Sequence, residues 1–320
     1  MKAPILAHLT PATKLIFLLL LVIFCFITVS LAGVLFAVPL FHLNLFKDLT
    51  ILNNFDNPAS VGLLKYLQII QSFGLFILPA ILAGIFFGGN MNCYLGTNKG
   101  SFSSVFLGTL LIMFVSLPLI NWLTSVNEMM SLPGSFRGIE QWMKETEEEA
   151  SKITEAFLNV KTTGGLLVNI LMIAIIPALG EELFFRGLLQ RLFSEWFKNV
   201  HIAIFFTAFL FGAIHLQFYG ILPRIFLGVV LGYLFFWTGS LWVPVFAHFI
   251  NNGSAVLISY LANRGFISTG YEDFGATNNV FLITGSILFT AGLLFLVYRS
   301  TGRRKKALDD SGFNPPPSFS

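Results

Sequence analysis

Two glutamates and two histidines stand inside apolar stretches of this chain, where titratable side chains are rare. Glu181 and Glu182 are adjacent, and His215 and His248 lie in the apolar stretches that follow. The remaining acidic residues and histidines fall in connections, an acidic insertion, the C-terminal tail or the ends of apolar runs. A carboxylate beside an imidazole in a low-dielectric medium can act as a general base. These four residues are therefore the first candidates for chemistry.

Two further polar residues share helix faces with members of this group. Arg186 follows Glu182 by four residues and Asn252 follows His248 by four, so each pair lies on one helix face. Glu182 and Arg186 can form a structural ion pair, but that leaves Glu181 and both histidines unexplained. A histidine and a carboxamide that project together can donate two hydrogen bonds to one oxygen, as an oxyanion hole requires. An asparagine can equally hold membrane helices together.

Composition indicates that these residues belong to a membrane protein. The 320-residue chain is 55% hydrophobic and contains 37 Phe. Charged residues make up 11% of it, against about 25% in soluble domains. A net charge of +3 gives no footprint for nucleic acid, and the two cysteines provide neither a disulfide framework nor metal-ligand spacing. We expect an all-α, polytopic bundle that contacts the lipid bilayer and has no nucleic-acid partner.

Eight apolar runs are long enough to cross a bilayer, because a helical span takes about 20 residues. They cover residues 14–40, 62–88, 103–124, 164–194, 200–219, 222–238, 240–260 and 278–298. The first run is too long for a cleavable signal and no small-residue cleavage site follows it, so we interpret it as a retained helix. No repeat of fixed period divides the chain.

These runs suggest six segments. They are a cytoplasmic N-terminal segment at 1–13, three helices over 14–124, an acidic insertion at 125–163, a core of four helices over 164–261, a loop and last helix over 262–298, and a basic, proline-containing tail at 299–320. The insertion carries Trp142, Met143, Ile153 and Phe157 at near-helical spacing among glutamates. It is expected to form an amphipathic helix with a solvated acidic face, or else a lid over a site.

Basic residues after the last run predict the orientation of the chain. Arg303 to Lys306 form a basic cluster, and such clusters mark the cytoplasmic side of a membrane. An even number of spans then places the N-terminus in the cytoplasm too, although the insertion on the opposite side also carries basic residues. The compactness of the chain favours a bacterial plasma membrane.

Helix lengths allow a crude test of whether the candidates meet. If the runs holding Glu181 and His215 form an antiparallel hairpin near Lys198 and Asn199, each residue lies about 25 Å from the turn, because a helix rises about 1.5 Å per residue. We therefore expect Glu181 and His215 to be in contact. His248 lies about 12 Å from its own turn, so it joins them only if the first hairpin protrudes on the cytoplasmic side.

Three motifs, taken in order, resemble those of a known family. They are E-E-x-x-x-R from Glu181 to Arg186, F-x-x-x-H from Phe211 to His215, and H-x-x-x-N from His248 to Asn252. On successive membrane helices they resemble the CPBP family, the CAAX proteases and bacteriocin-processing enzymes also called Abi, which includes the type II CAAX prenyl endopeptidases. The resemblance extends from Gly180 to Leu261.

The resemblance implies an intramembrane endopeptidase that hydrolyses a membrane-associated peptide or protein, which is prenylated for the eukaryotic members. Glu181 with His215 would activate a water, and His248 with Asn252 would stabilise the oxyanion. Glu182 would orient the cluster by pairing with Arg186. Glu181, His215 and His248 could also ligate a divalent metal such as zinc. The chain has no H-E-x-x-H motif and the metal-free interpretation uses the same residues, so the cofactor is left open.

Two other classes of function remain as alternatives. A proton- or cation-coupled transporter would use the same acid and histidines, and it predicts inverted repeats that this sequence lacks. A non-catalytic membrane scaffold or immunity protein of the same fold would be expected to carry incomplete motifs, whereas all three are complete here.

Overall fold

The computed structural model describes residues 4–42, 54–101, 103–268, 270 and 274–310. Every regular element in these ranges is a helix, as the sequence predicts. Within them, six helices are long and apolar enough to cross a bilayer, and a seventh span is counted if one bent pair acts together. The six are Pro11–Leu40, Pro58–Gly88, Thr163–Phe197, Phe218–Thr238, Trp242–Asn263 and Val280–Gly302. The chain is a multi-pass membrane protein.

Two of the eight predicted spans take a different form. Helix α11 (Val200–Ala213) has 14 residues, which is about 21 Å at a rise of 1.5 Å per residue and short of a full span. The range 103–124 forms α5 (Ser103–Val115) and α6 (Leu117–Glu128), bent by 44°. Pro118 explains the bend, because it has no N–H to donate to the carbonyl four residues before it.

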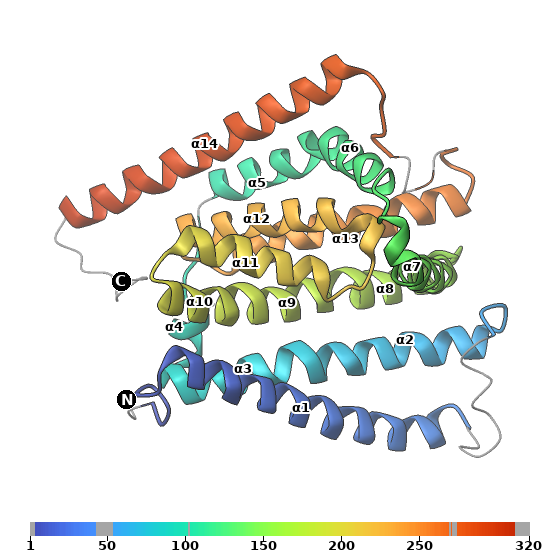
Figure 1. The fold of residues 1–320 in the computed structure, drawn as a ribbon, viewed down its shortest axis with the longest axis horizontal. Helices are drawn as coiled ribbons and strands as arrows, with labels where there is room; N and C mark the ends of the chain where they lie inside the picture. The colour runs from blue at the N-terminus through green and yellow to red at the C-terminus, as the bar shows by residue number, and fades with distance from the viewer. Residues whose placement is uncertain (1–3, 43–53, 102, 269, 271–273, 311–320) are drawn as a thin grey trace.

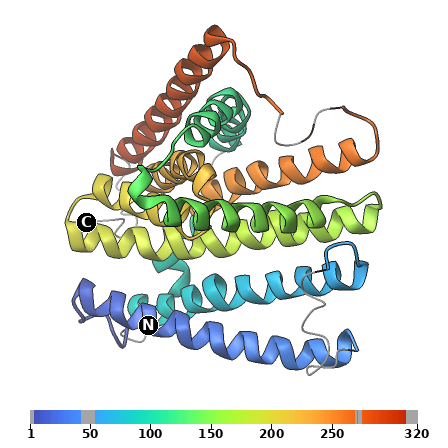
Figure 2. The ribbon, with the colours of Figure 1, turned by 45° about the vertical axis from the view of Figure 1, so that its right-hand side comes forward.

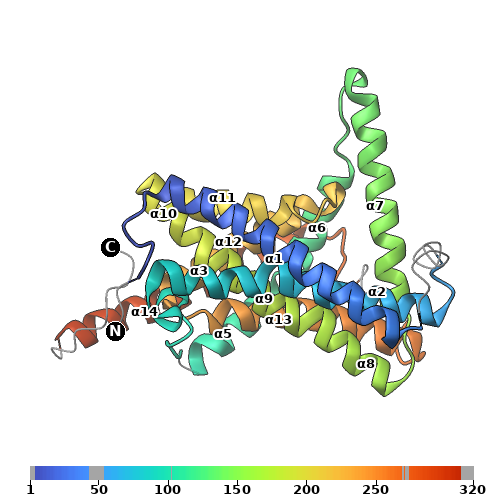
Figure 3. The same ribbon diagram turned by 90° about the horizontal axis from the view of Figure 1, so that it is seen from below.

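The two termini of the bundle lie at the same end. Helix α1 (Pro11–Leu40) starts where α14 (Val280–Asp310) ends, and the turn between α10 (Gln190–Phe197) and α11 lies at that end too (Figures 1 and 3). Helix α14 continues as a helix beyond the predicted boundary at residue 298. Residues 311–320, with the predicted proline run, lie outside the described part. Which side of the membrane this end occupies stays a prediction.

Short polar residues start the helices that frame the core. Thr162 accepts a hydrogen bond from the Gly165 amide at the start of α8 (Thr163–Asn169). Asn199 accepts from His201 and Ile202 at the start of α11. Lys198 ends α10 with a left-handed backbone (φ 51°), so the predicted hairpin does turn at Lys198 and Asn199. Caps of this kind satisfy amides that have no partner inside a helix.

The long helix Thr163–Phe197 runs through the middle of the molecule and contains two π-helical segments. Its parts are α8, η4 (Ile170–Ile175), α9 (Ile176–Glu182), η5 (Leu183–Leu189) and α10. On one side it packs against α1, α3 (Leu78–Gly88) and α4 (Met91–Leu95), and these three form a separate layer with α2 (Pro58–Ser72) and η2 (Phe73–Ile77) (Figure 2). On the other side lie α11, α12 (Ile221–Thr238) and α13 (Trp242–Asn263).

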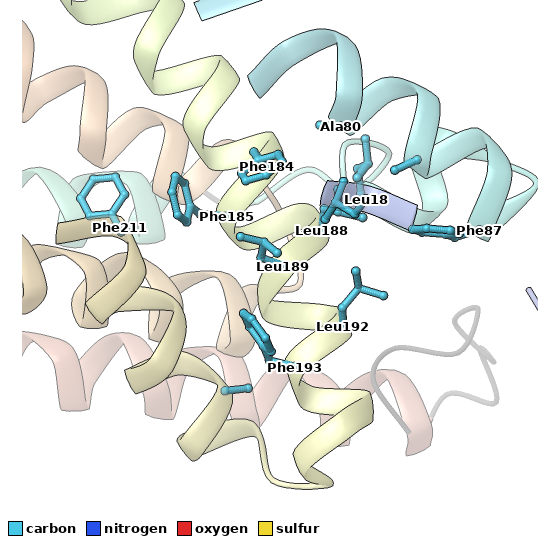
Figure 4. Packing of buried hydrophobic residues seen from close by; sticks show 13 residues of the cluster. Leu18, Ala80, Phe87, Phe184, Phe185, Leu188, Leu189, Leu192, Phe193 and Phe211 are labelled. Carbon is cyan, nitrogen blue, oxygen red and sulfur yellow. The ribbon is translucent and has the colours of Figure 1, made fainter. Parts of the chain in front are cut away.

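A buried apolar cluster fixes the height of this helix against its neighbours. Leu188 and Leu192 are fully buried near Leu18 and Phe87, while Phe185 turns toward Phe211 of α11 (Figure 4). The rings of Phe185 and Phe211 meet edge to face at 5.3 Å. This packing holds the polar residues one turn earlier, at the end of α9, inside the protein.

The insertion forms the amphipathic helix α7 (Arg137–Leu158), preceded by the short turn η3 (Gly134–Phe136). Helix α7 lies crosswise to the long helices at the end of the bundle away from the termini (Figures 1 and 3). Its last turn is anchored, because the Phe157 carbonyl accepts from Lys65 at 3.0 Å and from Asn169 at 2.7 Å.

Candidate active site

Glu182 is the hub of a buried polar cluster. Its Oε1 accepts hydrogen bonds from Arg186 Nη1 at 2.9 Å and from His248 Nδ1 at 2.8 Å. Glu182, Arg186 and His248 are 0%, 1% and 3% exposed. Arg186 also donates to the Gly228 carbonyl at 3.3 Å and lies 4.5 Å from the centre of the Phe211 ring. Burying either the Glu182 carboxylate or the Arg186 guanidinium alone would be costly, and the ion pair between them offsets part of that cost.

A proline places Asn252 beside His248. Pro177 cannot donate to the Ile173 carbonyl four residues earlier, and Asn252 Nδ2 donates to that carbonyl at 2.9 Å instead. The same Nδ2 lies 3.2 Å from His248 Nε2. Glu182 fixes the proton of neutral His248 on Nδ1, so Nε2 accepts from Asn252. Sequence reasoning expected both side chains to donate outward to one oxygen, and here they face each other.

Glu181 borders the same cluster but is left without a hydrogen bond. Its Oε2 lies 4.0 Å from His248 Nε2, and this buried oxygen has no hydrogen-bond partner among the described residues. The side chain is 12% exposed, whereas that of Glu182 is fully buried. A carboxylate oxygen that lacks a donor is suited to accept a proton.

His215 follows α11 in a tight connection. Its Nδ1 lies 2.7 Å from the Phe211 carbonyl, so Nδ1 carries the proton of the neutral ring and Nε2 is the basic nitrogen. The next residue, Leu216, has a left-handed backbone (φ 53°). No hydrogen bond or ion pair joins Glu181 to His215 among the described residues, so their expected contact stays a prediction.

Phe211 connects His215 to the buried cluster. Its ring contacts the rings of His215 at 5.2 Å and His248 at 5.8 Å, in addition to the Arg186 guanidinium. The first position of F-x-x-x-H therefore orients the histidine four residues later through both its carbonyl and its ring. The structure thus links Glu182, Arg186, His248 and Asn252 directly, with Glu181 and His215 at the rim.

Arg224 is a charged neighbour that sequence reasoning missed. It lies on α12, donates to the Gln217 side chain, and is close enough to act electrostatically on Glu181 and His215. It stands four residues after Gly220 in an apolar run. A basic residue inside an apolar run is the signal that could have identified Arg224.

The donor groups do not match a metal site. No group of three His, Cys, Asp or Glu side chains in the described part of the chain is arranged to hold a metal ion. Both ring nitrogens of His248 face protein groups, Glu182 at Nδ1 and Asn252 at Nε2. His248 therefore has no free ring nitrogen to act as the third ligand beside Glu181 and His215.

Comparison with known proteins matches one part of the chain to a family model. The family model described as "Type II CAAX prenyl endopeptidase Rce1-like" matches residues 163–254. The chain carries an Rce1-like domain. This domain begins with α8 and ends within α13, so it contains all six candidate residues. The resemblance expected from the three motifs is thereby confirmed.

One curated relative matches part of the chain. The uncharacterized protein YpbD of Bacillus subtilis (strain 168) is 30% identical over 86 residues. That match covers 26% of this chain and 41% of YpbD, so the chain spans less than half of the relative's length. No solved structure matches significantly.

Proposed function

We propose that this protein is an intramembrane endopeptidase that hydrolyses a peptide bond in a membrane-associated peptide or protein. One observation carries the proposal: inside the Rce1-like domain, a partly exposed carboxylate without a donor lies beside a histidine that a second, buried carboxylate orients. The multi-pass architecture suits a substrate that lies in or on the bilayer. A bacterial plasma membrane with cytoplasmic termini is our proposed location.

Glu181 and His215 are the proposed base system. A water bound between the Glu181 carboxylate and His215 Nε2 would lose a proton to this pair as its oxygen attacks the substrate carbonyl carbon. The proton then passes to the leaving amine when the carbon–nitrogen bond breaks.

His248 and Asn252 are the proposed stabilisers of the tetrahedral oxyanion. Asn252 Nδ2 now donates to His248 Nε2. When substrate binds, the substrate carbonyl oxygen would accept this hydrogen bond instead. With its Nδ1 held by Glu182 at 2.8 Å, His248 would donate to the oxyanion from Nε2 when both ring nitrogens carry a proton, and Asn252 would donate from Nδ2. Glu182 and Arg186 hold the cluster and do not contact substrate, because both are fully buried.

The test is cleavage by the purified full chain. The protein in detergent is incubated with lipidated and transmembrane peptides, alongside Glu181→Ala and His215→Ala, and products are identified by mass spectrometry. We expect new peptide ends with the wild type and none with either variant. Cleavage that persists in both variants would remove the proposed base system. A proton flux abolished by Glu181→Gln, without cleavage, would identify a transporter instead.

A further inference from the structure

Helix α7 has one apolar face, and only half of it is covered by protein. Residues Ile139, Met143, Thr146, Ala150, Ile153 and Phe157 recur at alternating steps of four and three, so they form one stripe. At the C-terminal end of the stripe Phe157 is buried at 7% exposure. At its N-terminal end Ile139 is 50% exposed, and so is the neighbouring Trp142.

The exposed half extends sideways from the bundle. Figure 3 shows the N-terminal part of α7 projecting beyond the other helices, and Figure 1 shows the same helix end-on at the end of the long helices. Ile139 shares a face with Phe157, so it points to the same side of α7 as the membrane-spanning helices. Beside those helices the surrounding medium is the lipid bilayer.

The opposite face is charged, and two of its lysines are paired. Lys144 pairs with Glu140 at 2.7 Å and Lys152 with Glu148 at 2.7 Å, each four residues apart. An amphipathic helix with this division, with a Trp at its apolar edge, is the kind that lies in the headgroup region. Glutamates outnumber basic residues on α7, so apolar contact rather than attraction to anionic lipid must hold it there.

We propose that α7 is an interfacial helix whose Ile139-bearing face rests in the headgroup–acyl boundary of the bilayer. This helix also holds the connection that carries His215. Glu147 accepts a hydrogen bond from the Tyr219 amide at 3.1 Å, and the Trp142 and Phe218 rings meet at 5.3 Å. Lipid contact along α7 thus fixes the position of the connection at the membrane surface. The inference does not depend on peptidase activity.

A pair of labelled variants tests this inference. In a Cys93→Ser background, Ile139→Cys and Gln141→Cys each receive an environment-sensitive fluorophore, and the full chain is reconstituted into phosphatidylcholine vesicles. Gln141 is the matched control, because it lies two residues away and about 200° around the helix. Both native side chains are exposed, so neither change disturbs packing; size-exclusion chromatography checks the fold.

We expect lipid-borne quenchers to quench the Ile139 probe and aqueous iodide to quench the Gln141 probe. The pattern should persist when anionic lipid is added. Equal iodide quenching at both positions would place α7 in water and overturn the proposal. An Ile139 probe shielded from iodide but untouched by lipid quenchers would also overturn it, because protein would then cover the face.

Discussion

Substitutions at the buried pair Glu182–Arg186 can distinguish a structural role for Glu182 from a catalytic role for Glu181. Glu182→Gln keeps the shape of the side chain and its Oε1 acceptor but removes the negative charge. Arg186 then keeps only uncharged partners in the interior: the amide oxygen at position 182, the Gly228 carbonyl at 3.3 Å and the Phe211 ring at 4.5 Å. Removal of one partner of a buried pair costs about 3–5 kcal/mol. We expect a loss of that order in unfolding free energy.

Glu181→Gln is the matched control for this prediction. The carboxylate lies one residue away, is 12% exposed and makes no hydrogen bond through Oε2, so stability should change by less than about 1 kcal/mol. Cleavage should fall by about 10²–10⁴, the usual contribution of a positioned base. Denaturant unfolding in detergent, with cleavage corrected for the folded fraction, measures both effects.

A double variant makes the reasoning refutable. Glu182→Gln with Arg186→Met removes both charges and leaves an apolar side chain in place of the guanidinium. Most of the stability lost in Glu182→Gln should then return, because no unpaired charge stays in the interior. If the double variant recovers none of the stability lost in Glu182→Gln, or if the two glutamate variants are equally stable, the division of roles is wrong.

Three further predictions follow from single contacts. Asn252→Ala leaves the Ile173 carbonyl without its 2.9 Å donor. The free energy of unfolding should fall by about 1–3 kcal/mol and the cleavage rate by about 10²–10³-fold. Asn251→Ala is the control, and equal losses in both variants would contradict the assignment. Phe211→Leu keeps the carbonyl but removes the ring that contacts both histidines. We expect kcat to fall by up to about 10²-fold with KM near normal. An unchanged kcat would contradict a positioning role for the Phe211 ring. Gly180→Ala puts a Cβ 2.9 Å from Ile77 and should cost about 1–3 kcal/mol in a thermal melt; Gly285→Ala, where no neighbour lies within 4 Å, should cost nothing comparable.

Much of the fold follows from length and hydropathy, because a bilayer leaves helices as the available structure for apolar runs of this length. The exceptions have local causes. Helix α11 stops at Ala213 before the left-handed Leu216, and Pro118 bends the range 103–124. The crosswise direction of α7 could not be predicted, since the same amphipathic pattern fits a helix that stands away from the bundle.

The sequence singles out the six candidate residues but does not show how they connect. Charges in apolar runs and three ordered motifs identify the six residues. Which carboxylate meets which histidine depends on helix rotation, and the π-helical segments on both sides of α9 shift that rotation. The hairpin distances favoured Glu181 with His215, whereas the structure pairs Glu182 with His248. The partner of Asn252 could have been found, because Pro177 marks the Ile173 carbonyl as lacking its helical donor.

The central claim is that Glu181 and His215 activate a water for peptide hydrolysis. The most direct measurement is mass spectrometry of a cleaved membrane peptide after reaction in water labelled with heavy oxygen. We predict a new C-terminal carboxylate that carries the label with the wild type, and no labelled product with folded Glu181→Gln or His215→Ala. Labelled product at wild-type rate from either folded variant would contradict the account.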